Sequence, residues 1–443
     1  MVVEQYEAKR KVFYGWWIVL VAFLCNFVWS GFAYYSFSLF VKSLENDFKW
    51  GRGEIMLGFS VFFLASGLVS PFIGKLITRF GERKVISIGA VLMGIAMALL
   101  GSVTNIWQFY AFYALVGIGM AGMGTIPASS LVSKWFNRRR GLAIGIMAFG
   151  VGMGGFVAAP VVAGTLIPVF GWRAAYLILG AVTCLIIIPA TLLIVKASKP
   201  EDMGLYPDGR KISEQAVQQK LSSNVTLKLT ERAAIAAPAF WLIAICVILS
   251  QFSMVGVSQN QVPFLMDIGF PIQTAAGALG FLALMSAVGK LGFGWLCDRI
   301  KAKYVSAIGF ILQVIGIIIL LNINQGSPVL MLWAFAFTMG LGIGSWLPTM
   351  SMLVSQNFGL VIYPTIFGLM TLCQCLGASI GPAVTGRLYD IMGDYKLAFL
   401  ILLGLYALAL PAVLLVRQPV QSTGESHVRK AIVFGLEKEL PAK

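Results

Sequence analysis

Long apolar blocks follow one another along most of the chain and are separated by short polar segments. An α-helix needs about 20 residues to cross a hydrocarbon core of about 30 Å, so each block predicts one transmembrane helix. The first block follows three basic residues but runs into further blocks without a small-residue cleavage site, so we interpret it as a helix and not as a signal peptide. The twelve blocks cover residues 14–41, 54–73, 85–104, 107–133, 141–167, 173–195, 238–266, 273–297, 304–322, 328–355, 362–388 and 397–416.

The longest polar connection divides these blocks into six and six. It runs from Lys196 to Ala236 and is rich in basic residues and turn formers. We therefore predict an all-α membrane protein with four parts. They are an N-terminal six-helix bundle (1–195), a cytoplasmic linker (196–236), a C-terminal six-helix bundle (237–417) and a cytoplasmic tail (418–443).

Composition and charge agree with this pattern. With 58% hydrophobic and 12% charged residues, the chain lies outside the range of water-soluble globular proteins. Most of its 33 Lys and Arg residues fall in the two tails and the even-numbered connections, which predicts that both termini are cytoplasmic. We expect a multi-pass protein of the plasma membrane, the inner membrane in a bacterium, in contact with lipid. The net charge of +15 then requires no nucleic-acid partner.

The six cysteines lie within or at the edges of apolar blocks, without the spacing of a disulfide framework or a metal site. We interpret them as small hydrophobic residues and expect neither a metal nor a cofactor.

The two halves resemble each other in sequence. GKLITRFGERKVISIG, which begins at Gly74, aligns with GWLCDRIKAKYVSAIG, which begins at Gly294. GMGTIPASSLVSKWF and GIGSWLPTMSMLVSQNF match around Pro127 and Pro348. Two six-helix halves related by a repeat are the plan of secondary transporters, whose binding site lies between the halves near the middle of the membrane. The repeat therefore predicts two pseudo-symmetric bundles and a site between them.

Four motifs resemble those of one family, the major facilitator superfamily, and within it the monocarboxylate transporter-like group, which includes oxalate/formate antiporter relatives. The first half carries a G-x-x-x-D-R-x-G-R-[RK]-like loop in which Thr78 replaces the aspartate, whereas the second copy keeps Asp298. WFNRRRGLAIGIMAFG, from Trp135, resembles the group's signature before the fifth helix. YGWWIV at Tyr14 and PEDMGLYPDG at Pro200 resemble two further segments. The resemblance implies the major facilitator fold.

The loop motifs predict gating residues at the cytoplasmic ends of the helices. An acidic side chain at one helix end can bind a neighbouring helix N-terminus or an arginine in only one conformation. A second interpretation remains open for Arg138 and its basic neighbours, which could serve only to set the topology. The predicted gating residues are Gly74, Arg79, Asp298, Arg299 and Arg138.

Lys290 is the charge closest to the centre of any apolar block, about 12 Å along its helix from Asp298. Placing a lysine there costs about 2.5–3.5 kcal/mol, and the sequence places no carboxylate to neutralise it within the membrane. An anionic substrate would supply the missing charge. The resemblance agrees, because it implies that a cation in this helix binds the substrate's carboxylate. The alternative is that Lys290 extends along the helix to the headgroups.

Other polar side chains at similar depth are weaker candidates, since packing between helices explains each of them equally well. The resemblance aligns Tyr35 with a proton-linked lysine of animal monocarboxylate transporters, and Ser286 with an aspartate. The predicted companions of Lys290 are Tyr34, Tyr35, Gln259, Asn260, Trp346 and Gln374.

The leading hypothesis is a secondary transporter for small organic monocarboxylates such as lactate or pyruvate, working as a monomer and by alternating access. Proton symport, anion exchange and facilitated diffusion remain open, because Lys290 is the only group in the pathway that could titrate. A dicarboxylate or oxalate/formate-type exchanger is the alternative within the same class. A membrane enzyme is disfavoured because every Asp and Glu falls in a loop, a tail or a helix end and the one His lies in the C-terminal tail, whereas a receptor would bind ligand without flux.

Overall fold

The computed structural model describes residues 13–137, 139–209, 231–359 and 362–416, and across these ranges it contains helices and no strand. The first half contains α1 (Gly15–Val28), the π-helical η1 (Trp29–Tyr35), α2 (Phe37–Phe48), α3 (Arg52–Phe80), α4 (Glu82–Leu100), α5 (Ile106–Met123), α6 (Thr125–Trp135), α7 (Arg140–Val161), the π-helical η2 (Val162–Leu166) and α8 (Ile167–Ile194). Three short helices follow, namely η3 (Pro200–Met203), η4 (Pro207–Gly209) and α10 (Glu231–Ala236). The second half contains α11 (Pro238–Asp267), α12 (Ile272–Cys297), α13 (Ala302–Leu321), α14 (Val329–Gly344), α15 (Trp346–Phe358), α16 (Tyr363–Met392) and α17 (Lys396–Leu415).

These helices form twelve membrane crossings, as the apolar blocks predict. The described residues contain eleven continuous helical stretches that are long and apolar enough to cross a bilayer. The longest spans 55 residues, Arg140–Ile194, and it breaks at Gly171. There φ is +77°, a conformation that glycine adopts at little cost, so this stretch turns back and crosses twice.

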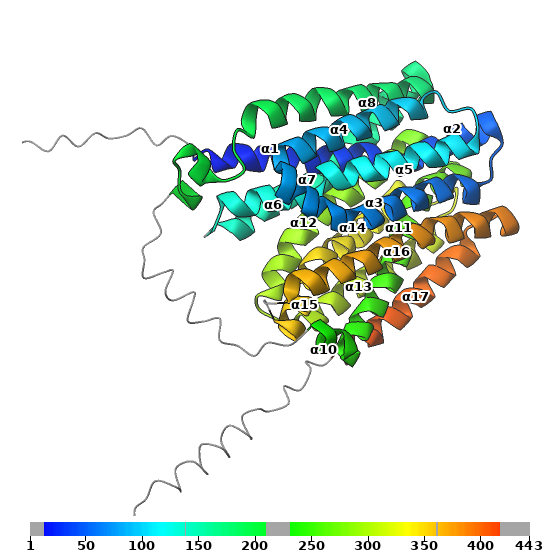
Figure 1. Cartoon of the computed structure of the whole chain (residues 1–443). Coiled ribbons are helices and arrows are strands. Elements are labelled where there is room, and N and C mark those ends of the chain that lie inside the picture. The colour runs from blue at the N-terminus through cyan, green and yellow to red at the C-terminus, as the bar shows by residue number, and fades with distance from the viewer. Residues whose placement is uncertain (1–12, 138, 210–230, 360–361, 417–443) are drawn as a thin grey trace, which may run out of the picture.

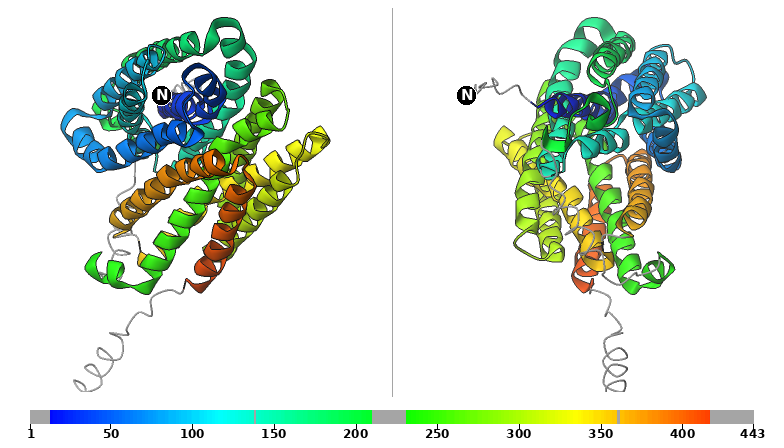
Figure 2. Two further views of the ribbon diagram at one scale, coloured as in Figure 1. Left: turned by 90° about the vertical axis from the view of Figure 1, so that its right-hand side faces the viewer. Right: turned by 60° about the vertical axis from the view of Figure 1, so that its left-hand side comes forward.

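The crossings group into two six-helix bundles, which Figures 1 and 2 show as two separate layers. The bundles touch chiefly where α3 packs along α16 and α7 packs along α12. We call the end at which α8 finishes and α11 begins the linker end, and the other end, at which α3 begins and α16 finishes, the opposite end. Residues 210–230 of the predicted linker, the whole predicted tail (418–443) and Arg138 lie outside the described residues.

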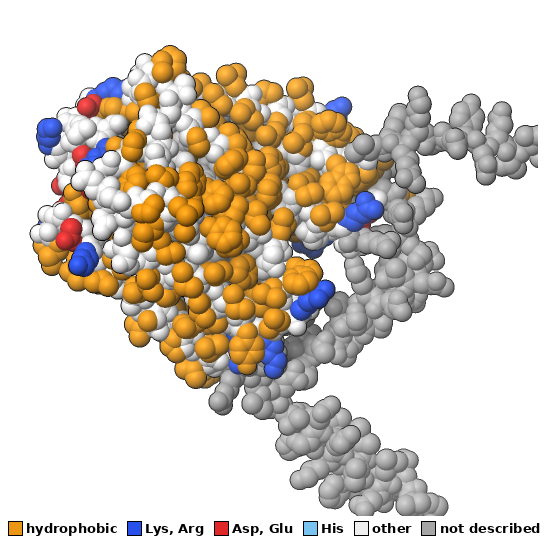
Figure 3. Space-filling view, turned by 180° about the vertical axis from the view of Figure 1, so that it is seen from behind, with side chains coloured by type: hydrophobic (Ala, Val, Ile, Leu, Met, Phe, Trp, Pro, Cys, Tyr) orange, Lys and Arg blue, Asp and Glu red, His pale blue; other side chains and the backbone are white. Residues whose placement is uncertain are grey.

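The outer surface between the two ends is apolar. Leu185, Leu193 and Leu330 are each at least 70% exposed. In Figure 3 hydrophobic side chains cover the broad middle of the molecule, while charged ones gather at its two ends. A surface of this size without polar cover is stable in lipid and not in water, which agrees with a membrane-crossing protein.

Glycines allow α7 and α12 to approach closely across the two halves. A Cβ at Gly152 would lie 2.5 Å from both the carbonyl oxygen of Ala283 and the Cβ of Ala287. Such contacts would force the helices apart. Small residues are the usual means of close helix packing in lipid, where the hydrophobic effect does not drive helices together.

We predict that Gly152→Ala destabilises the protein by about 1–3 kcal/mol, because the added methyl group overpacks this contact. Gly145→Ala, seven residues earlier in α7, is the matched control, since a Cβ there meets nothing within 4 Å. Alanine favours helix over glycine by about 1 kcal/mol, so the control should be neutral or stabilising. Thermal unfolding of the purified protein measures both. Equal shifts for the two variants would contradict the close contact.

Candidate functional site

A widened turn in the first crossing positions Tyr34 and Tyr35. The π-helical segment Trp29–Tyr35 interrupts the α-helix, and Ser36 stabilises it. Both the backbone N–H and the hydroxyl of Ser36 donate to the carbonyl oxygen of Gly31, at 3.2 and 2.6 Å. Gly31 in turn lies against the carbonyl oxygen of Gly154 in α7. Short π-helical turns occur frequently at functional sites, because they redirect the side chains that follow.

Tyr34 contacts the second half. The Nε2 of Gln259 in α11 donates to the backbone carbonyl oxygen of Tyr34 at 3.2 Å, and the Tyr34 hydroxyl lies beside Ser258 and Gln259. The Oε1 of Gln259 is buried and accepts no hydrogen bond from any described residue. An acceptor left unpaired inside a protein is costly unless a ligand or water completes it. The structure therefore brings Tyr34 and Gln259 together between the halves.

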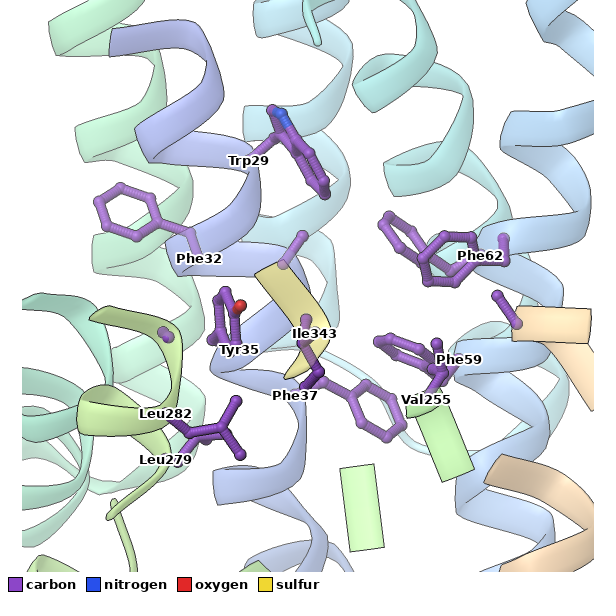
Figure 4. Close-up of a cluster of buried hydrophobic side chains, with 14 of the residues drawn as sticks. Trp29, Phe32, Tyr35, Phe37, Phe59, Phe62, Val255, Leu279, Leu282 and Ile343 are labelled. Atoms are coloured by element: carbon purple, nitrogen blue, oxygen red, sulfur yellow. The ribbon is translucent and has the colours of Figure 1, made fainter. Parts of the chain in front are cut away.

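Tyr35 lies between the first crossing and α12. Its ring contacts the ring of Tyr34, with centroids 4.8 Å apart, and it lies so close to Gly155 that a Cβ there would clash. Figure 4 shows Tyr35 over Leu279 and Leu282 of α12, with the aromatic side chains of α3 across from it. Only 4% of Tyr35 is exposed, and its hydroxyl forms no hydrogen bond within the described ranges.

Lys290 lies on the face of α12 that meets the first half. Positions 283, 287 and 290 are on one side of the helix, and Ala283 and Ala287 pack against Gly155 and Gly152 of α7. Lys290 is one turn further toward the linker end and is partly exposed. Among the residues that the structure describes, none forms a hydrogen bond or ion pair with it. The Oγ of Ser286, one turn before Lys290 in the chain, is buried and also has no hydrogen-bond partner within the described chain.

The remaining predicted companions lie elsewhere. Asn260 is fully buried, donates to the carbonyl oxygen of Gly256 at 2.9 Å and accepts from Tyr395 at 3.4 Å. Trp346 lines a small cavity inside the second half, with Phe310 and Thr349. Gln374 of α16 is partly buried. No contact recorded by the structure joins these three side chains to Lys290.

The predicted gating residues at the linker end do not join the halves in this conformation. Asp298 is exposed and forms no ion pair with a described residue. The guanidinium groups of Arg299 and Arg79 lie over the rings of Trp295 and Phe80 of their own helices, at 4.1 and 5.2 Å. A Cβ at Gly74 would meet nothing within 4 Å. Their role as a gate remains a prediction.

At the opposite end, a cluster of charged side chains joins the two halves, and the sequence analysis missed it. Arg52, at the start of α3, is only 2% exposed. Its guanidinium binds both carboxylate oxygens of Asp267, at the end of α11, and it also pairs with Glu45 of α2. Lys42 of α2 forms a second ion pair with Asp267. We call Lys42, Glu45, Arg52 and Asp267 the charge cluster.

The helix N-terminus of α3 is capped from the other half. The backbone N–H groups of Arg52 and Gly53 donate to the two carboxylate oxygens of Asp390, each at 2.8 Å. Asp390 lies near the end of α16. The partial positive charge of a helix N-terminus attracts a carboxylate, so this contact adds to the cluster and holds α16 against α3.

Tyr395 connects the charge cluster to α11. Its hydroxyl accepts from Arg52 at 2.9 Å and donates to Asn260 at 3.4 Å. Burial raises the pKa of the Tyr395 hydroxyl, which therefore stays protonated and able to donate. One sequence signal could have indicated the cluster, since Lys42 and Arg52 belong to the minority of basic residues on the side that the positive-inside bias leaves poor in them.

The sequence profile of the Major Facilitator Superfamily matches residues 18–382 and, in a second match, 293–440. The chain belongs to this superfamily. Its members are transporters and not enzymes, so the chain is a multi-pass membrane transporter for a small-molecule substrate. The predicted superfamily and fold are confirmed.

Sequence relatives within the superfamily include monocarboxylate transporters. Human monocarboxylate transporter 11 is 27% identical over 402 residues, which cover 88% of this chain and 80% of that protein. The uncharacterized MFS-type transporter YcxA of Bacillus subtilis is 23% identical over 386 residues, which cover 86% and 90% of the two chains. These relatives are similar in sequence to the chain along most of its length.

Solved structures share the fold. A D-xylose-proton symporter superposes with a TM-score of 0.72 at 16% identity, covering 91% of this chain and 98% of the other. A bacterial homolog of the human lysosomal transporter Spinster, in an inward-facing and unoccupied conformation, gives a TM-score of 0.67 at 19% identity and covers 91% and 95%.

We predict that Arg52→Gln destabilises the protein by about 3 kcal/mol, because it leaves the half-buried carboxylates of Glu45 and Asp267 with Lys42 as the one cation of the cluster. Arg299→Gln is the control, since Arg299 is exposed, lies over the ring of Trp295 and forms no ion pair with a described residue. Thermal unfolding of the purified protein is the measurement. A loss as small as that of the control, within about 0.5 kcal/mol, would contradict a structural role for the cluster.

Proposed function

We propose that this protein is a secondary transporter that moves small organic monocarboxylates, of the size of lactate or pyruvate, by alternating access, and that Lys290 binds the carboxylate. The observation that supports the proposal is the position of Lys290, one turn beyond Ala283 and Ala287 of α12, which pack against α7, together with the lack of an ion pair between Lys290 and any described acidic residue. The monocarboxylate transporters among the sequence relatives support the same substrate class.

The electrostatics of Lys290 argue for an anion. A charged side chain within a membrane needs water, a partner or a bound ion to compensate for lost hydration. The ion pairs of the described chain, other than one between Glu82 and Lys134 in the first half, all belong to the charge cluster at the opposite end. A substrate carboxylate would complete Lys290 at the depth at which transporters of this plan bind their cargo.

The neighbouring polar groups could orient the rest of the substrate. Tyr35 and Gln259 lie at the interface of the halves, and Ser286 lies one turn from Lys290 in α12. The Oε1 of Gln259 and the Oγ of Ser286 are buried and have no hydrogen-bond partner among the described residues. A hydroxyl or keto oxygen next to the carboxylate, as in lactate or pyruvate, offers a complementary group. Tyr34 contributes to the proposed site because its backbone carbonyl oxygen accepts a hydrogen bond from Gln259 and so fixes that side chain.

The proposed site can neutralise one negative charge. Lys290 is the only Lys or Arg in the described interior of the crossings, and α16 adds no second cation at that depth. A dianion such as oxalate would therefore retain an uncompensated charge in a medium of low dielectric constant. This favours monocarboxylates over dicarboxylates.

The distribution of Lys and Arg assigns the linker end to the cytoplasm, in the inner membrane if the organism is a bacterium. The charge cluster then closes the extracellular end in the described conformation. In the outward-facing state, Asp298, Arg299 and Arg79 would form the cytoplasmic gate, with Gly74 allowing close approach. Arg138, outside the described residues, is the proposed partner from the first half.

We predict that Lys290→Gln abolishes uptake of labelled pyruvate or lactate into proteoliposomes, since it removes the charge that holds the carboxylate. Lys290→Arg should retain part of the activity, because it keeps the charge but changes its geometry. Lys301→Gln is the control, because Lys301 is an exposed lysine just beyond the same helix. Normal uptake by Lys290→Gln, at wild-type protein levels, would disprove the proposal.

We also predict that unlabelled monocarboxylates in excess suppress the uptake of labelled pyruvate, whereas oxalate and succinate do not. The reason is that a second carboxylate would remain unpaired in the site. Competition in proteoliposomes at pH 7, where all these acids are ionised, is the measurement. Equal suppression by oxalate would favour an exchanger for dicarboxylates instead.

A further inference from the structure

The charge cluster is divided unequally between the halves. Lys42, Glu45 and Arg52 belong to the first half, whereas Asp267 belongs to the second. When a transporter of this fold opens at the extracellular end, the halves separate there. Asp267 then leaves with α11, and the first half keeps two cations and one carboxylate. In the open state, the extracellular end of the first half therefore carries a net positive charge.

Once Asp267 has moved away, Arg52 and Lys42 form a binding site that fits a carboxylate. Arg52 binds Asp267 with two nitrogens, Nη1 to Oδ2 and Nη2 to Oδ1, and Lys42 binds the same Oδ1. Paired N–H groups of a guanidinium match the two oxygens of a carboxylate, and such bidentate contacts are among the strong hydrogen bonds of proteins. The aromatic ring of Tyr389, 3.8 Å from the Arg52 guanidinium, belongs to α16 and would also withdraw on opening.

We propose that Lys42 and Arg52 form an extracellular capture site for the substrate's carboxylate, which Asp267 occupies in the closed conformation. This rests on the proposed function, because the cargo must carry a carboxylate. An incoming monocarboxylate takes the position of the Asp267 side chain when the extracellular end is open. As the halves close, Asp267 returns to the two cations and displaces the cargo toward the interior, where Lys290 is the next cation.

Two carboxylates thus compete for one pair of cations. A cluster that served only as a lock would respond alike to the loss of any member, since each loss favours the outward-open state and lowers the external KM. A capture site responds differently. Loss of Lys42 weakens substrate binding, whereas loss of the Asp267 charge removes the competitor. The two substitutions therefore shift the external KM in opposite directions.

The test is the initial rate of labelled pyruvate uptake into right-side-out membrane vesicles. We expect Lys42→Gln to raise the external KM by roughly tenfold, the scale of one charge-assisted hydrogen bond, and Asp267→Asn to lower it severalfold. Lys42→Arg should keep the wild-type KM, which shows that the charge at position 42 matters. In inverted vesicles both Lys42→Gln and Asp267→Asn should raise the KM from the cytoplasmic side, because both weaken the closed extracellular end.

Lys396→Gln and Asp394→Asn are matched controls. Both residues are exposed at the same end of the protein, and neither belongs to the charge cluster. These controls should leave the external KM unchanged. A fall in the external KM for both Lys42→Gln and Asp267→Asn would overturn the capture site and leave a simple lock, with Lys290-dependent transport intact. Absence of monocarboxylate transport by the wild type would overturn the proposed function, and the capture site with it.

Discussion

A hydrocarbon core supplies neither hydrogen bonds nor counter-charges, and every feature of this protein follows from that constraint. Backbone groups must pair within each segment, so the described chain crosses the membrane only as helices. Helix packing must come from close contact, which small residues such as Gly152 allow between α7 and α12. Ionic contacts between the halves then concentrate at the membrane surface, where water and several partners are available.

Two cations illustrate how the constraint is met. Arg52 is almost fully buried, yet it is surrounded by Glu45, Asp267 and two tyrosine rings, and the two carboxylates balance its charge and that of Lys42. Lys290 lies deeper and has no such partner among the described residues. The first arrangement stabilises one closed conformation. The charge of Lys290 is left uncompensated by the described residues, and a bound substrate anion can neutralise it. This is the basis of the proposed transport function.

The two sites are connected through α11. Asn260 receives a hydrogen bond from Tyr395, which itself accepts from Arg52, while the preceding residue, Gln259, binds Tyr34 at the interface of the halves. The helix α11 thus contacts Tyr395 beside the charge cluster through Asn260, and Tyr34 at the interface of the halves through Gln259. Separation of the halves would break the contact of Arg52 with Tyr395 and that of Tyr34 with Gln259, so α11 connects the charge cluster to the proposed substrate site.

The sequence by itself determined the membrane class, the number of crossings, the two related halves and the position of Lys290, because these depend on hydrophobic length and on local spacing. It did not reveal which polar residues meet. Asn260 and Gln259 are adjacent in the chain, but tertiary packing directs one toward Tyr395 and the other toward Tyr34. Arg52 and Asp267 are 215 positions apart, and each alone resembles an ordinary charge at a helix end. Only the packing of one half against the other decided that they pair, since ionic contacts depend on distance in space and leave no pattern in either local segment.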